Sequence, residues 1–542
     1  MNIEESSNIT QARRLSSKVK SFFSNFPAFG WKALVIAFLV GFFVRLVPEV
    51  LSYPHAIGFD TVYYAWRIGS GVVWYNWSQV FSSWLLYGLL VPVQNLVRGD
   101  PFMILKLAAP LLFGLNTCGI YYFARRALNW TERKALFSSL VFSFQIAALA
   151  ISWEFFRNIL GLGFLLFAFA FLKDVGKSVK ASLFFVLFSV LVMFSHEFTS
   201  IILFIVVLGV VAFTVLKETK LTAIRVLGFF APALAVFLGQ VYFVAFPVAY
   251  AVPTGNVLFA YQTAGHYRGV FSLFTNYLGV FDNVQSYSSY LVLFSHVFSL
   301  FVLLFALVLP LVLVGFFRNR LLAFWSGLLL VGGFGAVVVP WFAPDMWSRW
   351  MLMLVYPFTF YVVNGIGKVW RAGGSGAIPI WTRLNWLRIS KNAAKSLLVV
   401  SSCLGFLFMA CPMLYGRFGL VGLPTTVNYV PSSMQSNSLP LIDVDSAVNA
   451  LKWVNNRMSS SSAFLAQDAF YYWSILCMDN KHTIVYFKND FDAAITTANA
   501  HGFDTLYFIW WNTDIGWYGI TAPSGFVQLT SFDRISVYIY VG

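Results

Sequence analysis

The chain has 542 residues, of which 59% are hydrophobic and 11% are charged, and its mean hydropathy is +0.74. Soluble globular proteins carry about 25% charged residues, so this composition excludes them and indicates an integral membrane protein. Lys and Arg number 36 against 21 Asp and Glu. In so apolar a chain we assign this excess to cytoplasmic loops and expect no nucleic-acid partner. The four cysteines show no zinc-site spacing and no disulfide framework.

Eleven apolar runs are long enough to be transmembrane helices, which need about 20 residues each. The polar, basic segment 1–31 precedes the first run, which lacks a small-residue cleavage site, so we expect a retained anchor with a cytoplasmic N-terminus. The runs lie at 32–51, 101–123, 135–152, 158–173, 181–196, 198–216, 226–247, 291–316, 321–341, 350–367 and 396–414.

The segment 79–97 is also apolar, and the distribution of basic residues decides whether it crosses. With eleven spans, the basic clusters at 125–134, 173–180 and 368–395 all fall on the side of residue 1. A twelfth span at 79–97 would place these clusters outside. We therefore predict a first outer loop at 52–100, whose many Tyr and Trp residues favour contact with the membrane surface.

The composition changes after residue 415. A Pro-, Ser- and Asn-rich stretch makes 415–440 a linker, and 441–542 alternates helical and strand patterns, which is typical of an α/β sheet domain. Helices are expected near 444–458, 469–479 and 491–501, and strands near 463–466, 483–487, 506–510, 526–530 and 535–541. The fold class is therefore a multi-span helical membrane domain at 32–414 followed by an α/β domain that the odd span count places outside the cell.

Ionisable residues at membrane depth are costly and usually functional or paired, and most of those in this chain fall on the outer side. Asp60 lies in the first outer loop, and three further outer turns carry polar groups. We assign Asp60 a role in chemistry and expect the others to contact substrate: Glu154, Arg157, His196, Glu197, Asp345 and Arg349.

Each of these assignments has a purely structural alternative. Arg45 and Glu49, four residues apart, are expected to pair on one helix face and are left out of the site. The spacings of Glu154 with Arg157 and of Asp345 with Arg349 also allow ion pairs. His196 alone fits a helix-end histidine, and the HEF string lacks the second histidine of a zinc motif, so no metal ligands are assigned. Asp60 itself fits a helix cap.

Four strings of outer-side residues resemble motifs of GT-C integral-membrane glycosyltransferases, especially prokaryotic and archaeal ones. They are YPHAIGFDTVYY at 53–64, SWEFFRN at 152–158, SHEFT at 195–199 and RWMLMLVYP at 349–357. The resemblance implies about eleven spans and inverting transfer of a sugar from a polyprenyl-phosphate donor to a glycan, lipid or protein acceptor at the outer face. It also implies that Asp60 takes the acceptor proton or holds a metal ion, and that Arg349 contacts the donor phosphate.

The chain departs from the family pattern at two places. Thr61 follows Asp60 where many members carry a second acid, so the use of a divalent metal stays open. The string WWNTD at 510–514 resembles a motif of oligosaccharyltransferases, but Asn512 stands where that motif has its acid, and we discount it. The alternatives to an enzyme are a lipid or lipid-linked-sugar flippase and a non-catalytic scaffold of an envelope complex. A flippase would carry polar residues near span midplanes.

Overall fold

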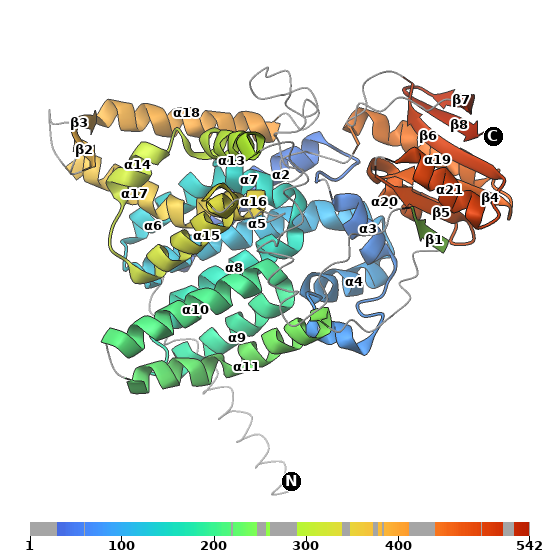
Figure 1. Ribbon diagram of the computed structural model, residues 1–542. Helices are drawn as coiled ribbons and strands as arrows, with labels where there is room; N and C mark the ends of the chain where they lie inside the picture. The colour runs from blue at the N-terminus through green and yellow to red at the C-terminus, as the bar shows by residue number, and fades with distance from the viewer. Residues whose placement is uncertain are drawn as a thin grey trace, which may run out of the picture.

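A computed structural model of the chain describes residues 30–58, 60–217, 220–245, 256–260, 290–338, 347–371, 378–381, 384–410, 439–488, 490–512 and 525–540. Within these ranges the protein consists of a helical bundle and a smaller sheet domain (Figure 1). The sheet domain lies at one end of the bundle, beside α3 and α4, and the hairpin of β2 (Ile378–Trp381) and β3 (Leu384–Ile389) lies at the opposite end.

The apolar runs form the helices of the bundle, because a helix satisfies every backbone polar group within its own segment. Each of the eleven predicted runs coincides with a helix or with two consecutive helices. The helices are α2 Trp31–Leu51, α3 Thr61–Gly69, α4 Leu85–Val97, α5 Pro101–Arg126, α6 Glu132–Ser143, α7 Ile146–Glu154, α8 Phe156–Leu172, α9 Val179–Ser195, α10 Glu197–Lys217, α11 Lys220–Ala245, α13 Tyr290–Phe305, α14 Leu309–Gly315, α15 Arg320–Val338, α16 Trp347–Met353, α17 Val355–Arg371 and α18 Lys391–Ala410.

Two of the runs are bent where a single helix was expected. The α6–α7 pair bends by 62° and the α13–α14 pair by 75°. In the second pair Pro310 occupies the first turn of α14, where a proline ends the preceding helix because it has no N–H to donate. Six helices in the described ranges are long and apolar enough to span a membrane, or up to eight spans with each bent pair counted once. The count of eleven crossings stays a prediction.

The segment 79–97 forms a short 3-10 helix, η1 (Trp77–Phe81), and the 13-residue α4. A helix of 13 residues is roughly 20 Å long, which is shorter than the roughly 30 Å hydrocarbon core. This length is consistent with the prediction that 79–97 does not cross.

The sheet domain contains the predicted alternation of helices and strands. Its six-stranded sheet has the order β1-β5-β4-β6-β8-β7, with β1, β5, β4 and β6 parallel and β8 and β7 antiparallel. The elements are η5 Leu441–Asp443, α19 Val444–Asn455, β4 Ser462–Gln467, α20 Asp468–Cys477, β5 Thr483–Phe487, α21 Phe491–Ala500, β6 Thr505–Trp511, β7 Phe526–Phe532 and β8 Ile535–Tyr540.

One strand of this sheet comes from the middle of the chain. β1 (Asn256–Phe259) follows α11 and pairs in parallel with β5, Asn256 opposite Thr483. The sequence predicted a sheet domain made of residues 441–542 alone. The structure adds residues 256–259 to its sheet. A strand of four residues is too short for its hydrophobic pattern to be recognised from the sequence alone.

The sheet domain packs directly on the segment 52–100, the predicted first outer loop. Val62 of α3 belongs to the hydrophobic core of the domain. The rings of Tyr63 and Tyr472 lie 5.1 Å apart between α3 and α20, and those of Phe102 and Trp473 lie 5.6 Å apart. These contacts join α3, which follows Asp60, to α20.

A buried charge network holds the loop that leads to Asp60. Arg45 Nη1 lies 2.7 Å from Glu49 Oε1, which confirms the pair expected on this helix face, and both side chains are buried. Lys106 of α5 adds a second cation 3.2 Å from the other Glu49 carboxylate oxygen. Lys106 also donates to the hydroxyl of Ser52 at 3.0 Å and to the carbonyl of His55. The network thereby ties the loop after α2 to α5.

Glu49→Gln should destabilise the protein strongly, because it leaves Arg45 and Lys106 buried without their counter-charge. Breaking a buried ion pair by removing one partner costs about 3–5 kcal/mol. Thermal unfolding of the purified protein measures the change. The exposed Glu132→Gln serves as the control and should leave the melting temperature nearly unchanged. A Glu49→Gln protein that melts with the wild type would contradict a stabilising network.

The positive-inside interpretation places the sheet domain outside and the β2–β3 end of the bundle in the cytoplasm. Single cysteines test it in a background without the four native ones. A membrane-impermeant maleimide should label Ile442→Cys, which is exposed in the sheet domain, in intact cells. It should label Ser390→Cys, before α18, only after permeabilisation. The reverse pattern would overturn the topology.

Candidate active site

The turn before α3 presents Asp60 with its carboxyl group unused by the backbone. Gly58 has φ +137°, and a Cβ there would collide with the carbonyl oxygen of Trp153, so only glycine fits. Asp60 occupies the N-cap position of α3, yet no capping hydrogen bond from its side chain is present among the described contacts of this helix. Thr61 instead donates to the carbonyl of Ile57 at 3.0 Å. The helix-cap alternative for Asp60 is therefore not supported.

Charged groups from three other elements act on Asp60. Burial is the strongest influence and raises the pKa of the Asp60 carboxyl above its ordinary value. The guanidinium groups of Arg349 (α16) and Arg157 (α8) lower this pKa, and the carboxylate of Asp468 raises it further. The predicted residues Asp60, Arg157 and Arg349 are thus brought together, although 97 to 289 positions separate them in the sequence.

Arg157 connects Asp60 to the turn between α9 and α10. Its guanidinium interacts with the carboxylate of Glu197 and with the phenol oxygens of Tyr64, Tyr87 and Tyr63. The sequence also allowed a pairing of Arg157 with Glu154, whose side chain is not among the described parts of the structure, so this alternative stays open.

His196 serves the helix that follows it. Its Nδ1 accepts a hydrogen bond from the backbone N–H of Phe198 at 3.0 Å and lies 3.9 Å from Glu197 Oε2. The ring is buried and stacks on that of Phe198. This arrangement is the helix-end role that the sequence left open.

Arg349 lies at the start of α16 with its guanidinium carbon 4.1 Å from the centre of the Phe155 ring. An arginine stacked on an aromatic face keeps its positive charge. Its expected partner Asp345 lies outside the described residues. The site therefore unites Asp60, Arg157, His196, Glu197 and Arg349, and leaves Glu154 and Asp345 undecided.

The sequence analysis missed Asp468, the first residue of α20. Asp468 Oδ1 accepts a hydrogen bond from the Tyr486 hydroxyl at 2.6 Å, and Gln467 caps the helix through the N–H of Ala469 at 2.7 Å. Asp468 and Tyr472 are four residues apart, so they share the helix face that meets α3. An acid directly after a buried parallel strand was the available signal, since ligands bind beyond the carboxyl ends of such strands.

The tryptophans that we discounted have a structural role. Trp510 and Trp511 lie in the domain core, and Trp511 Nε1 donates to Asp443 Oδ2 at 2.9 Å.

Within the described part of the chain, no group of three or more His, Cys, Asp or Glu side chains could hold a metal ion. Asp60 and Asp468 form an acidic pair from two different domains.

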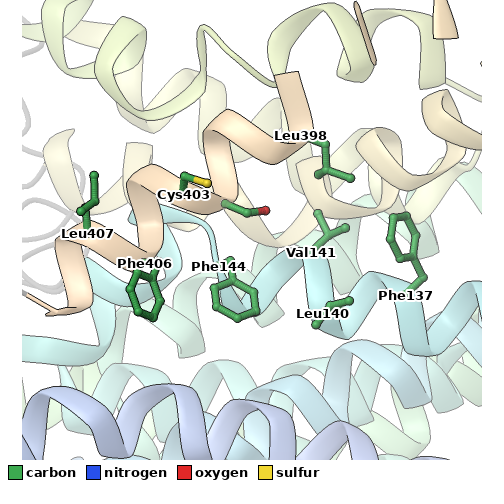
Figure 2. Close-up of a pocket in the computed structure, with 9 residues that line it drawn as sticks. Phe137, Leu140, Val141, Phe144, Leu398, Cys403, Phe406 and Leu407 are labelled. Atoms are coloured by element: carbon green, nitrogen blue, oxygen red, sulfur yellow. The ribbon is translucent and has the colours of Figure 1, made fainter. Parts of the chain in front are cut away.

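Two open, apolar hollows lie at the surface of the bundle beside α6. One of about 490 Å³ lies between α6 and α18, and Figure 2 shows its lining side chains, including Phe137, Phe144 and Phe406. A second, of about 370 Å³, lies between α2 and α6 and shares Leu140 and Phe144 with the first. Together they form a groove lined by hydrocarbon side chains. Phe408 of α18 stacks on Trp153 at 4.2 Å, and the Trp153 carbonyl faces Gly58.

No protein-family model and no curated protein sequence matches the chain. Solved structures do match it. ArnT from Cupriavidus metallidurans bound to undecaprenyl phosphate has a TM-score of 0.45 at 12% identity, over 95% of this chain and 99% of that one. The Archaeoglobus fulgidus oligosaccharyltransferase in the apo form has a TM-score of 0.52 at 12% identity, over 91% of this chain and 70% of that one. The resemblance to GT-C proteins is confirmed for the fold: the chain has the architecture of a GT-C membrane protein.

Proposed function

We propose that this protein is a membrane glycosyltransferase that moves a sugar, with inversion, from a polyprenyl-phosphate-linked donor to an acceptor at the outer face. The observation that carries the proposal is the placement of Asp60 within electrostatic reach of Arg349 and Arg157, at the junction of the bundle and the sheet domain. A carboxylate beside two cations matches a reaction that removes a proton at one point and releases a phosphate at another.

On the donor side, Arg349 and Arg157 meet the phosphate. Guanidinium groups bind phosphate oxygens in a bidentate manner, and they stabilise the negative charge that grows as the sugar–phosphate bond breaks. The hydrocarbon of a lipid-linked donor needs an apolar path. The groove along α6 supplies an apolar surface for it.

On the acceptor side, Asp60 takes the proton of the acceptor hydroxyl. The acceptor oxygen then attacks the anomeric carbon, and the bond between that carbon and the phosphate oxygen breaks, leaving its electron pair on the phosphate. Asp468 and Tyr472 of α20 face the same space and supply a carboxylate and an aromatic ring for a hydroxyl-bearing acceptor. The sheet domain thus completes the site.

Asp60→Asn tests the base role alone, because the amide keeps the shape of the side chain but does not accept a proton. Sugar transfer should fall by roughly 10²–10⁴-fold, as for the loss of a general base. The measurement compares glycan products and lipid-linked sugars in membranes that contain either protein. Glu132→Gln is the matched control. A folded Asp60→Asn protein with the wild-type rate would exclude the base role, and lipid movement without any new glycosidic bond would indicate a flippase.

Two substitutions should shift the pH dependence of the transfer rate in opposite directions. Transfer needs ionised Asp60, so activity falls as pH decreases through its raised pKa. Arg349→Ala removes a charge that lowers this pKa, which should move the acidic limb to higher pH. Asp468→Asn removes a charge that raises it, which should move the limb to lower pH. Rates measured between pH 4 and 8 decide the matter, and shifts in the same direction would refute the arrangement.

A further inference from the structure

A further cavity, lined by basic and apolar side chains, lies at the end of the bundle opposite Asp60. It has a volume of about 350 Å³ and lies where α8 and α10 end and where α11 and α15 begin. α8 starts beside Arg157 and α10 starts at Glu197, so both helices run from the candidate active site to this cavity. The 21 residues of α10 span roughly 30 Å. The cavity therefore faces the other side of the membrane from the active site.

The rim and the floor of this cavity differ in chemistry. Four basic side chains line the rim: Lys173, Lys177, Arg318 and Arg320. The floor is apolar and includes Phe169 and Val226, which are buried. Lys and Arg side chains at such an edge lay their hydrocarbon stems on apolar surface and hold their charges at headgroup level.

The segments that contribute to the cavity contain more basic residues than acidic ones. The segments 173–180, 217–225 and 316–320 contain eight Lys or Arg residues and two acids, Asp174 and Glu218. Asp174 is engaged by Arg126, whose Nη2 lies 2.9 Å from its carboxylate. The rim thus carries a net positive charge, which suits an anion.

The surface beside the cavity exposes large apolar side chains. Leu216 of α10 is 79% exposed, and Leu221 and Ile224 of α11 are 57% and 64% exposed. Large apolar side chains exposed at the end of membrane helices contact acyl chains. A ligand that combines a phosphate with a hydrocarbon chain would satisfy both the rim and the floor.

We propose that this cavity binds the phosphate-bearing headgroup of an anionic membrane lipid, with the start of an acyl chain on its apolar floor. Basic pockets between membrane helices recognise anionic headgroups through charge and hydrogen bonding. The bound lipid joins the ends of four helices. This assignment is independent of the glycosyltransferase proposal, because it uses none of the residues placed at the active site.

The test measures lipid binding to the full-length protein in detergent. Native mass spectrometry should show tighter binding of phosphatidylglycerol than of phosphatidylcholine. Lys177→Gln/Arg318→Gln/Arg320→Gln should weaken phosphatidylglycerol binding about 100-fold, since each lost charge near an anionic surface contributes roughly a five-fold factor. The same lipid should raise the melting temperature of the wild type more than that of the variant.

Two further variants keep the result interpretable. Arg371→Gln/Lys391→Gln/Lys395→Gln removes three charges at the same end of the bundle but outside the cavity, and should bind as the wild type does. Arg318→Lys/Arg320→Lys preserves the charge and should keep most of the affinity. Equal binding by the cavity variant and the distant variant would overturn the proposal. Inorganic phosphate at millimolar concentration that displaces the lipid and stabilises the protein equally well would assign the site to free phosphate and overturn the lipid assignment.

Discussion

The buried carboxylate of Glu49 is the interaction on which the arrangement of the outer end depends. It lies between Arg45 and Lys106, and Arg45 continues the network to Ser152 of α7 through a 3.0 Å hydrogen bond. In a low-dielectric interior a charge is stable only when it is paired, so these groups allow few alternative positions for α2, α5 and α7. These charged groups also hold the loop after α2, which carries Gly58 and Asp60. The network therefore fixes the place of Asp60 between the bundle and the sheet domain.

The sheet domain is part of the candidate site and not an appendage to it. α20 brings Asp468 and Tyr472 to the face of α3, and β1 fastens a segment that follows α11 to the edge of the sheet. His55 adds a contact of 3.3 Å to Asp445. Movement of the domain would therefore change the electrostatic environment of Asp60, because one of the charges acting on that carboxyl belongs to α20.

The two ends of the bundle present different charge patterns on a shared set of helices. The end that carries the candidate site combines carboxylates with arginines, which suits the proposed removal of a proton and release of a phosphate. The opposite end carries an excess of Lys and Arg around an apolar floor. α8 and α10 reach both ends, and Arg157 and Glu197 lie at the ends of these helices that are remote from the basic cavity.

The sequence by itself determined the helical membrane class, the order of helices and strands in the sheet domain, and most of the outer polar residues, because these follow from local hydropathy, periodicity and the side bias of basic residues. The sequence allowed a structural role for both His196 and Asp60. Only the tertiary structure showed that His196 caps a helix end and that the Asp60 carboxyl makes no capping hydrogen bond. The partnership of Asp468 with Asp60, the strand β1 and the pairing of Lys106 with Glu49 were decided by tertiary structure alone. Each joins residues far apart in the chain, and no local pattern encodes a contact whose partner is set by the packing of other elements.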